Sequence, residues 1–378
     1  MNTVLFVSNG HGEVAIAERM AKELPPEIAC DHLALVGTFE HSAVMRDVGP
    51  RRAMPSGGLV AMGNMRNIAR DLGAGLIGHT LAQLRFLSGV QHTYRVAIAV
   101  GDVYALLMAL RARASATIFV GTAKSVYVAP YGPLEERVMA NARAIFVRDT
   151  ATARRLLAHG IDARTANVIV DLYASDDAAM IDAPFDPRLA LFPGSREAAY
   201  GDALMLCRVV RELSAGKPKL GALLSVAPGL DAARMEASFA GEGWHIRHRD
   251  DPYAPFSLFS GDREVVRAWC GSLSAMLHGT TLVLGQAGTA NEAAAAAGIP
   301  VVAFERTKTH AWYRKRQIGL LGDALLIVTG DEHSVAFAVA GLLDDPVRRE
   351  RMGSIGRERM GAAGGAKLIA QEVVRLCG

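Results

Sequence analysis

Short runs of apolar, often β-branched residues recur through the first half of the chain, and stretches of helical character separate most of them. The runs lie at residues 4–8, 33–37, 96–101, 117–121, 144–148 and 168–171. Strands that alternate with helices along a chain usually pair in parallel, with helices on both faces of the sheet. The pattern therefore predicts a first domain built on a parallel sheet, over residues 1–175.

The second half repeats this scheme after a break. Residues 174–187 are acidic, contain two prolines and show no period, which is typical of a linker. Further apolar runs lie at 189–192, 222–227, 245–248, 265–269, 281–284, 301–304 and 325–328. We predict an α/β fold of two Rossmann-type doubly wound domains, 1–175 and 188–347, facing each other across a ligand-binding cleft. A helical segment, 348–378, is expected to return to the first domain.

The segment 282–304 carries the densest signals, because a strand, a glycine turn, an alanine-rich helix and a second strand follow one another closely. The first helical turn after Gly288 and Thr289 has unpaired N–H groups and the positive end of the helix dipole, which suit a phosphate. Gly285 and Gly288 would let a ligand approach the backbone, and Glu292 would accept hydrogen bonds from ribose hydroxyls. In the alternative interpretation the glycines only shape a tight turn and Glu292 offsets the dipole.

A second turn of this kind opens the second domain. Gly194, Ser195 and Arg196 follow the strand at 189–192 and precede a helix, so they are expected at the same sheet edge as Gly288. A guanidinium holds two phosphate oxygens and a hydroxyl adds a third contact. The alternative is a Pro-Gly turn with a serine cap and a solvated arginine.

The loop after the first strand also has glycines. Residues 10–15 fit the loose G-x-G-x-x-G/A dinucleotide pattern, and Glu40 would then bind a ribose. Glu13, however, would stand where the pyrophosphate belongs and repel it. We therefore interpret His11 and Glu13 as polar residues that face the cleft, against the alternative of a solvated histidine and an ordinary first-turn glutamate.

Asp102 ends the strongest apolar strand of the first domain, at the sheet edge where catalytic carboxylates reside in such folds. A general base that activates a hydroxyl must be a carboxylate or imidazole within hydrogen-bond reach. Asp102, Glu13 and His11 are the candidates. Asp102 as a cap of the following helix is the alternative.

Residues 57–87 are apolar, glycine-rich and basic rather than acidic. Such a segment can dip into a membrane interface or receive a lipid. A buried helical pair with a few exposed arginines is the alternative interpretation.

Composition narrows the function classes. A formal charge of +3 and the lack of dense Lys/Arg runs argue against a nucleic-acid partner. The four cysteines lie far apart and form no zinc-spaced pair, so neither a disulfide framework nor a metal site is expected. The first residues lack the features of a signal peptide and no apolar run is long enough to span a membrane, which favours the cytoplasm.

In these residues the chain resembles the GT-B glycosyltransferases, and most of all lipid-A-disaccharide synthase and its related proteins. The resemblance runs nearly from end to end. It rests on Pro-Gly-Ser-Arg at 193–196, Gly-Thr-Ala at 288–290 with Glu292, the loop 9–13, Val-Gly-Asp at 100–102 and Asn-Val-Ile-Val-Asp at 167–171. The synthase itself begins with a Gly-Glu-Thr-Ser-Gly-Asp loop, whereas the Asn-Gly-His-Gly-Glu loop here is closer to that of the peptidoglycan-precursor N-acetylglucosaminyltransferase. This departure favours the related subgroup.

The resemblance implies transfer of a hexosamine-type sugar from a UDP-sugar donor to a lipid-linked acceptor, with no metal and no cofactor. Donor contacts would come from the residues of the two glycine turns, Gly194, Ser195, Arg196, Gly288, Thr289 and Glu292. Gln317 would add a further contact. The acceptor would enter from the first domain near residues 57–87, with peripheral contact to the cytoplasmic face of the inner membrane.

Two rival functions remain open. A UDP-N-acetylglucosamine 2-epimerase shares the fold and the donor but needs no lipid surface. An NAD-dependent enzyme that uses the turn at residues 10–15 is the less favoured rival, because Glu13 obstructs that turn.

Overall fold

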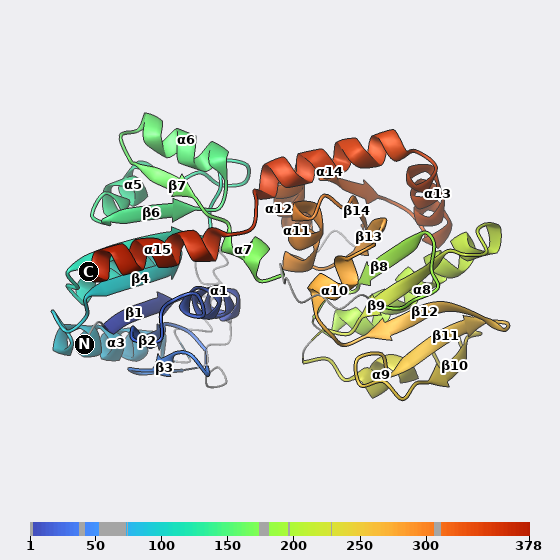
Figure 1. The fold of residues 1–378 in the computed structure, drawn as a ribbon, viewed down its shortest axis with the longest axis horizontal. Helices are drawn as coiled ribbons and strands as arrows, with labels where there is room; N and C mark the ends of the chain where they lie inside the picture. The colour runs from blue at the N-terminus through green and yellow to red at the C-terminus, as the bar shows by residue number, and fades with distance from the viewer. Residues whose placement is uncertain are drawn as a thin grey trace. The chain divides into compact units, whose positions relative to one another are not determined.

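The computed structural model describes residues 3–37, 42–52, 73, 75–173, 181–195, 197–227, 229–305 and 311–378, with only the backbone at 11 and 311–313. The chain divides into two compact units (Figure 1). Unit 1 comprises residues 1–172 with 361–378, and unit 2 comprises residues 173–360. The predicted segment 348–378 is therefore divided between the units: its first helix belongs to unit 2 and its last to unit 1.

Unit 1 is built on a seven-stranded sheet of order β3-β2-β1-β4-β5-β6-β7, in which every pair is parallel. Its strands are β1 (Thr3–Ser8), β2 (Ala29–Ala34), β3 (Arg46–Asp47), β4 (Val96–Gly101), β5 (Ala116–Gly121), β6 (Ala144–Val147) and β7 (Ala163–Thr165). Its helices are α1 (His11–Ala21), α3 (Leu76–Gly89), α4 (Val103–Arg111), α5 (Pro133–Met139), α6 (Thr150–Ala158), α7 (Val168–Asp171) and α15 (Gly365–Cys377). The central strands β1 and β4 are continuous buried apolar runs, as parallel strands covered on both faces require.

Unit 2 is built on an eight-stranded sheet of order β10-β11-β12-β9-β8-β13-β14-β15. Its strands are β8 (Arg188–Phe192), β9 (Gly221–Ser225), β10 (His245–His248), β11 (Phe256–Ser260), β12 (Arg263–Trp269), β13 (Leu282–Gly285), β14 (Val301–Phe304) and β15 (Leu325–Val328). Its helices are α8 (Ala198–Gly216), α9 (Ala232–Ala237), α10 (Leu273–Leu277), α11 (Thr289–Ala296), α12 (Ala311–Leu321), the 3₁₀ helix η3 (Gly322–Ala324), α13 (Glu332–Leu343) and α14 (Pro346–Met360). Strand β11 pairs antiparallel with both β10 and β12, whereas the other pairs are parallel.

Three sequence expectations are corrected here. Residues 168–171, predicted as a strand, form helix α7, because a four-residue apolar run fits either element and the edge strand β7 lies just upstream. The second strand begins and ends earlier than the predicted 33–37. The second sheet is not parallel throughout, because Gly261 and Asp262 make a two-residue hairpin between β11 and β12, with Gly261 at a φ of 60°.

The end of the chain completes unit 1. Helix α15 packs against α1 and α7, whereas α14 packs against α11 and η3 in unit 2. Asp171, at the end of α7, is buried, and its carboxylate accepts hydrogen bonds from the backbone N–H groups of Gly364 (2.5 Å) and Ala366 (2.6 Å) at the start of α15. Asp171, the last residue of the Asn167–Asp171 motif, thus holds the returning helix.

Candidate functional site

Each sheet has a switch point, where the order of its parallel strands reverses, and candidate residues flank both switch points. In unit 1 the order turns between β1 and β4, and in unit 2 between β8 and β13. At such a switch point the two flanking loops diverge beyond the carboxyl ends of the strands and leave a crevice for a ligand. The loops after β1 and β4 carry Asn9 and Asp102, and those after β8 and β13 carry Ser195 and Gly288.

The two glycine turns of unit 2 lie on neighbouring strands. Gly285 is in register with Phe192, and the N–H of Gln286 donates to the carbonyl of Phe192 at 2.8 Å. Gly194 has a φ of 111°, a left-handed conformation that favours glycine, and Ser195 is exposed. Arg196 lies outside the described residues.

Helix α11 begins at this edge with its backbone donors uncapped by a side chain. Gly288 is its N-cap residue and supplies no capping hydrogen bond, and Thr289 is exposed in the first turn. Glu292 lies in the same turn and is buried. First-turn N–H groups without a side-chain cap, a hydroxyl and the positive dipole end together suit a phosphate, and the adjacent carboxylate suits neutral hydroxyls.

Gly285 has a different role from the one expected. A Cβ atom at this position would lie 1.9 Å from Oδ1 of Asn291, whose Nδ2 donates to the carbonyl of Gly285 at 3.1 Å. Asn291 is fully buried. The absence of a side chain at 285 therefore makes room for Asn291, which fixes the turn, rather than for a ligand.

Gln317 likewise supports the loop 286–288. It is 3% exposed, on α12; its Nε2 donates to the carbonyl of Ala287 at 2.6 Å and its Oε1 accepts from Arg314 at 2.8 Å. Arg314 also donates to the carbonyl of Phe304 at 3.0 Å and to the side chain of Gln286. These contacts hold the loop in place from behind, and sequence reasoning missed both Arg314 and Gln286.

In unit 1 the structure brings four polar side chains together at the switch point, in two pairs. Nδ2 of Asn9 donates to Oδ2 of Asp102 at 3.2 Å, and the hydroxyl of Thr122 donates to Oε1 of Glu13 at 3.5 Å. A Cβ atom on Gly101 would lie 3.2 Å from Cγ of Glu13. Two carboxylates thus lie at the ends of β4 and its neighbours.

Asp102 is also the N-cap of α4, since its Oδ1 accepts from the N–H of Ala105 at 3.0 Å. Capping and the contact with Asn9 occupy both of its oxygens, which makes Asp102 a holder of the loop after β1. The backbone of His11 begins α1, but its side chain and Glu40 lie outside the described residues.

A buried polar chain lies beneath this edge. The hydroxyl of Ser8, at the end of β1, is 2.8 Å from Nε2 of His32, and Nδ1 of His32 is 3.5 Å from Asp47. Ser8 and His32 are both buried. Burial, together with the charge of Arg51, lowers the pKa of His32 to about 4, so the neutral imidazole is the form that the fold accommodates.

Helices α3 and α4 each carry exposed apolar side chains. Ile77 and Leu81 on α3 are 63% and 49% exposed, and Tyr104 and Leu107 on α4 are 39% and 51% exposed. The helices pack together, and Nε of Arg111 donates to the hydroxyl of Ser88 at 3.2 Å. Neither helix carries an acidic residue. Within the expected acceptor segment, residues 57–72 and 74 lie outside the described part of the chain.

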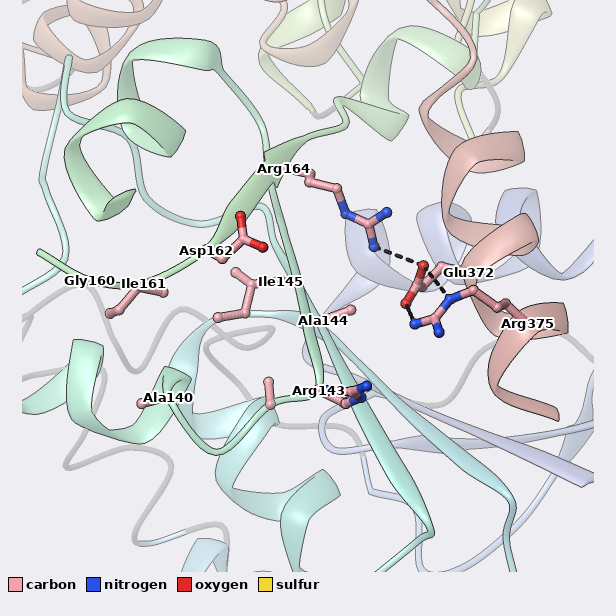
Figure 2. Close-up of a pocket in the computed structure, with 11 residues that line it drawn as sticks. Ala140, Arg143, Ala144, Ile145, Gly160, Ile161, Asp162, Arg164, Glu372 and Arg375 are labelled. Carbon is pink, nitrogen blue, oxygen red and sulfur yellow. Dashed lines mark hydrogen bonds and ion pairs between the residues drawn. The ribbon is translucent and has the colours of Figure 1, made fainter. Parts of the chain in front are cut away.

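A cavity of about 610 Å³ lies at the opposite, amino-terminal edge of the first sheet (Figure 2), next to the starts of β6 and β7. The Glu372 carboxylate accepts from Arg164 at 3.0 Å and from Arg375 at 2.5 Å, and these bonds lower the pKa of Glu372. Two of the arginines that line the cavity thus share one buried carboxylate. Within unit 1, this cavity lies at the sheet edge opposite to the switch point between β1 and β4.

Comparison with known proteins places the fold. No protein-family model and no curated protein match the chain. Among solved structures, the calicheamicin glycosyltransferase CalG4 is 17% identical with a TM-score of 0.63, and the alignment covers 100% of this chain and 98% of CalG4. MurG of Acinetobacter baumannii is 12% identical with a TM-score of 0.57 (99% and 100% covered). A putative UDP-N-acetylglucosamine 2-epimerase of Listeria monocytogenes is 16% identical with a TM-score of 0.60 (97% and 94% covered).

These similarities span the whole chain, and the chain has the α/β fold of the GT-B class, with two Rossmann-type units. This confirms the predicted fold class. The solved structures of this fold include both glycosyltransferases and UDP-N-acetylglucosamine 2-epimerases. In the described part of the chain, no helix is both long and apolar enough to cross a membrane.

Proposed function

We propose that this protein is a glycosyltransferase that moves a hexosamine-type sugar from a UDP-sugar to a lipid-linked acceptor. The observation that carries the proposal is the different chemistry of the two switch points. Unit 2 presents an uncapped helix end, hydroxyls and a glycine turn, whereas unit 1 presents two carboxylates. The first set suits a nucleoside diphosphate, and the second suits activation of a hydroxyl.

In this proposal the diphosphate of the donor is bound at the amino end of α11. The N–H groups after Gly288, the Thr289 hydroxyl and the turn at 194–196 hold its oxygens, and Glu292 accepts from the ribose hydroxyls. Gln317 acts through the loop 286–288 that it supports. The positive helix end and the guanidinium of Arg196 balance the charge that develops on the departing UDP, so the reaction needs no metal.

Glu13 is the proposed base. It takes the proton of the acceptor hydroxyl as the acceptor oxygen bonds to the anomeric carbon and the bond to the UDP oxygen breaks. Glu13 is preferred to Asp102 for two reasons. Glu13 lies beside Gly101 and Thr122, at the ends of β4 and β5. The oxygens of Asp102 already accept hydrogen bonds from Asn9 and from the N–H of Ala105 in α4. The same position argues against an NAD-dependent enzyme, because the carboxylate would lie beside a dinucleotide's pyrophosphate.

The exposed surface of α3 and α4 supports the lipid-linked acceptor. It combines four apolar side chains with Arg85 and Arg111 on the same helix faces, a combination that suits an anionic membrane surface. We expect Leu81→Glu to reduce sedimentation with vesicles of anionic phospholipid several-fold. The matched control is Leu157→Glu, which changes an exposed leucine on α6, away from α3 and α4 in the sequence. Equal losses in both variants, or none in either, would contradict a membrane role for this surface.

The epimerase alternative is supported by several solved structures of the same fold, including one bound to UDP-GlcNAc. Product analysis separates the two functions. The purified protein is incubated with radiolabelled UDP-N-acetylglucosamine, with and without a bacterial lipid extract. Lipid-dependent label in the organic phase is the expected result. A nucleotide sugar inverted at C2, formed without lipid, would overturn the transferase in favour of the epimerase.

A further inference from the structure

Tyr173 is the first residue of unit 2, and its side chain reaches the candidate phosphate site of that unit. Its hydroxyl donates to the hydroxyl oxygen of Thr289 at 3.0 Å, although the two residues are 116 positions apart. Thr289 is exposed in the first turn of α11. No motif in the sequence links these two residues.

This hydrogen bond constrains the direction in which the Thr289 hydroxyl points its own hydrogen. A hydroxyl that accepts a hydrogen bond from one side has its remaining O–H directed to another acceptor, and a chain of two hydroxyls polarises the last donor. At the amino end of a helix, the acceptor that the local dipole favours is an anion. Burial raises the pKa of the Tyr173 phenol. The hydrogen bond with Thr289 lowers this pKa and the charge of Glu292 raises it, and the net shift is upward. The phenol therefore keeps its proton and stays a donor.

We propose that Tyr173 is a positioning residue for the diphosphate of the donor: it orients the Thr289 hydroxyl so that this group donates to a phosphate oxygen. The inference rests on the proposed function, since it assumes that a UDP-sugar binds at α11. It assigns Tyr173 no contact of its own with the nucleoside. Its effect must therefore pass through Thr289 and must concern the phosphates only.

Three variants test the relay: Tyr173→Phe, Thr289→Val and the double variant. Calorimetry with UDP, and competition of uridine against UDP, give the affinities without added metal. We expect Tyr173→Phe to weaken UDP binding about fivefold, the usual size for one hydrogen bond, and to leave uridine affinity unchanged. In the Thr289→Val background the same substitution is expected to have no further effect. Tyr253→Phe, which removes an exposed hydroxyl elsewhere in unit 2, serves as the matched control.

The outcomes separate the inference from the proposed function. A wild-type protein that does not bind UDP overturns the proposed function itself. If the wild type binds UDP, three results overturn the role of Tyr173: unchanged UDP affinity in Tyr173→Phe, equal losses for UDP and uridine, or full additivity with Thr289→Val. Retained UDP affinity in Tyr253→Phe shows that the measured loss belongs to position 173.

Discussion

Asp171 offers the sharpest test of how the chain end is attached to unit 1. The variant Asp171→Ala removes both acceptors of the Gly364 and Ala366 N–H groups but keeps the helical turn of α7. The backbone carbonyl of residue 171, which accepts from Nε of Arg19 at 3.2 Å, is also retained. The substitution therefore isolates the carboxylate that holds the first turn of α15.

The size of the effect follows from what is left unpaired. Loss of a capping carboxylate costs about 1 kcal/mol. The N–H of Ala366 is buried, and a buried donor without a partner adds roughly 1–3 kcal/mol. Gly364 is exposed, so water replaces the carboxylate there at little cost. We expect a total of about 2–4 kcal/mol for the docking of α15, which corresponds to a roughly 30- to 900-fold larger equilibrium constant for its opening.

Hydrogen exchange measures this opening helix by helix. In Asp171→Ala, the protection of the α15 amides should fall by that factor, whereas the amides of β8 and β13 in unit 2 should keep theirs. Asp171→Asn retains one acceptor and should lie between the variant and the wild type. Asp331→Ala, which removes the exposed N-cap of α13, is the control. Unchanged α15 exchange in Asp171→Ala would refute the anchoring role.

Two further predictions concern unit 1. Asp102→Asn turns an amide toward the donor of Asn9 and displaces the loop that carries Glu13. The kcat should therefore fall by about 10²-fold, while calorimetry shows unchanged UDP binding. An unaltered kcat would contradict this role of Asp102. Burial lowers the pKa of His32 to about 4 from an ordinary 6.5. Between these pH values the unfolded chain binds more protons at this histidine than the folded chain does. The free energy of unfolding that His32 contributes is therefore complete above pH 6.5 and is lost as the pH falls toward 4. The loss is on the order of 3 kcal/mol. Urea unfolding of His32→Asn should show a flatter pH profile, and a profile parallel to that of the wild type would count against the buried neutral imidazole.

The sequence predicted the parts of the fold that burial dictates. Central strands such as β1, β4 and β13 are continuous apolar runs that end at a glycine or a polar residue, so both their position and the loops after them could be predicted. The edge strands β3 and β7 have only two and three residues and were not predicted. Strand β11, which lies inside the second sheet, was also missed, whereas the polar edge strand β10 was predicted.

The candidate site was predicted as far as local sequence defines it. The loops at 9–13, 102, 194–195 and 288–292 lie at the switch points because each follows a predictable strand. The side chains that hold these loops in place could not be predicted in this way. Arg314, Asn291 and Tyr173 reach the site through tertiary contacts. Local pattern also misread Gly285, whose requirement for glycine arises from packing against Asn291.

Titration of the purified protein with UDP, without added metal, is the first test of whether a UDP-sugar binds at α11. We expect micromolar binding by the wild type, loss of that binding in Glu292→Ala, and retention in Glu358→Ala, an exposed glutamate of α14. A protein that does not bind UDP but binds NAD would contradict the proposed function and move the nucleotide site to the turn at residues 10–15.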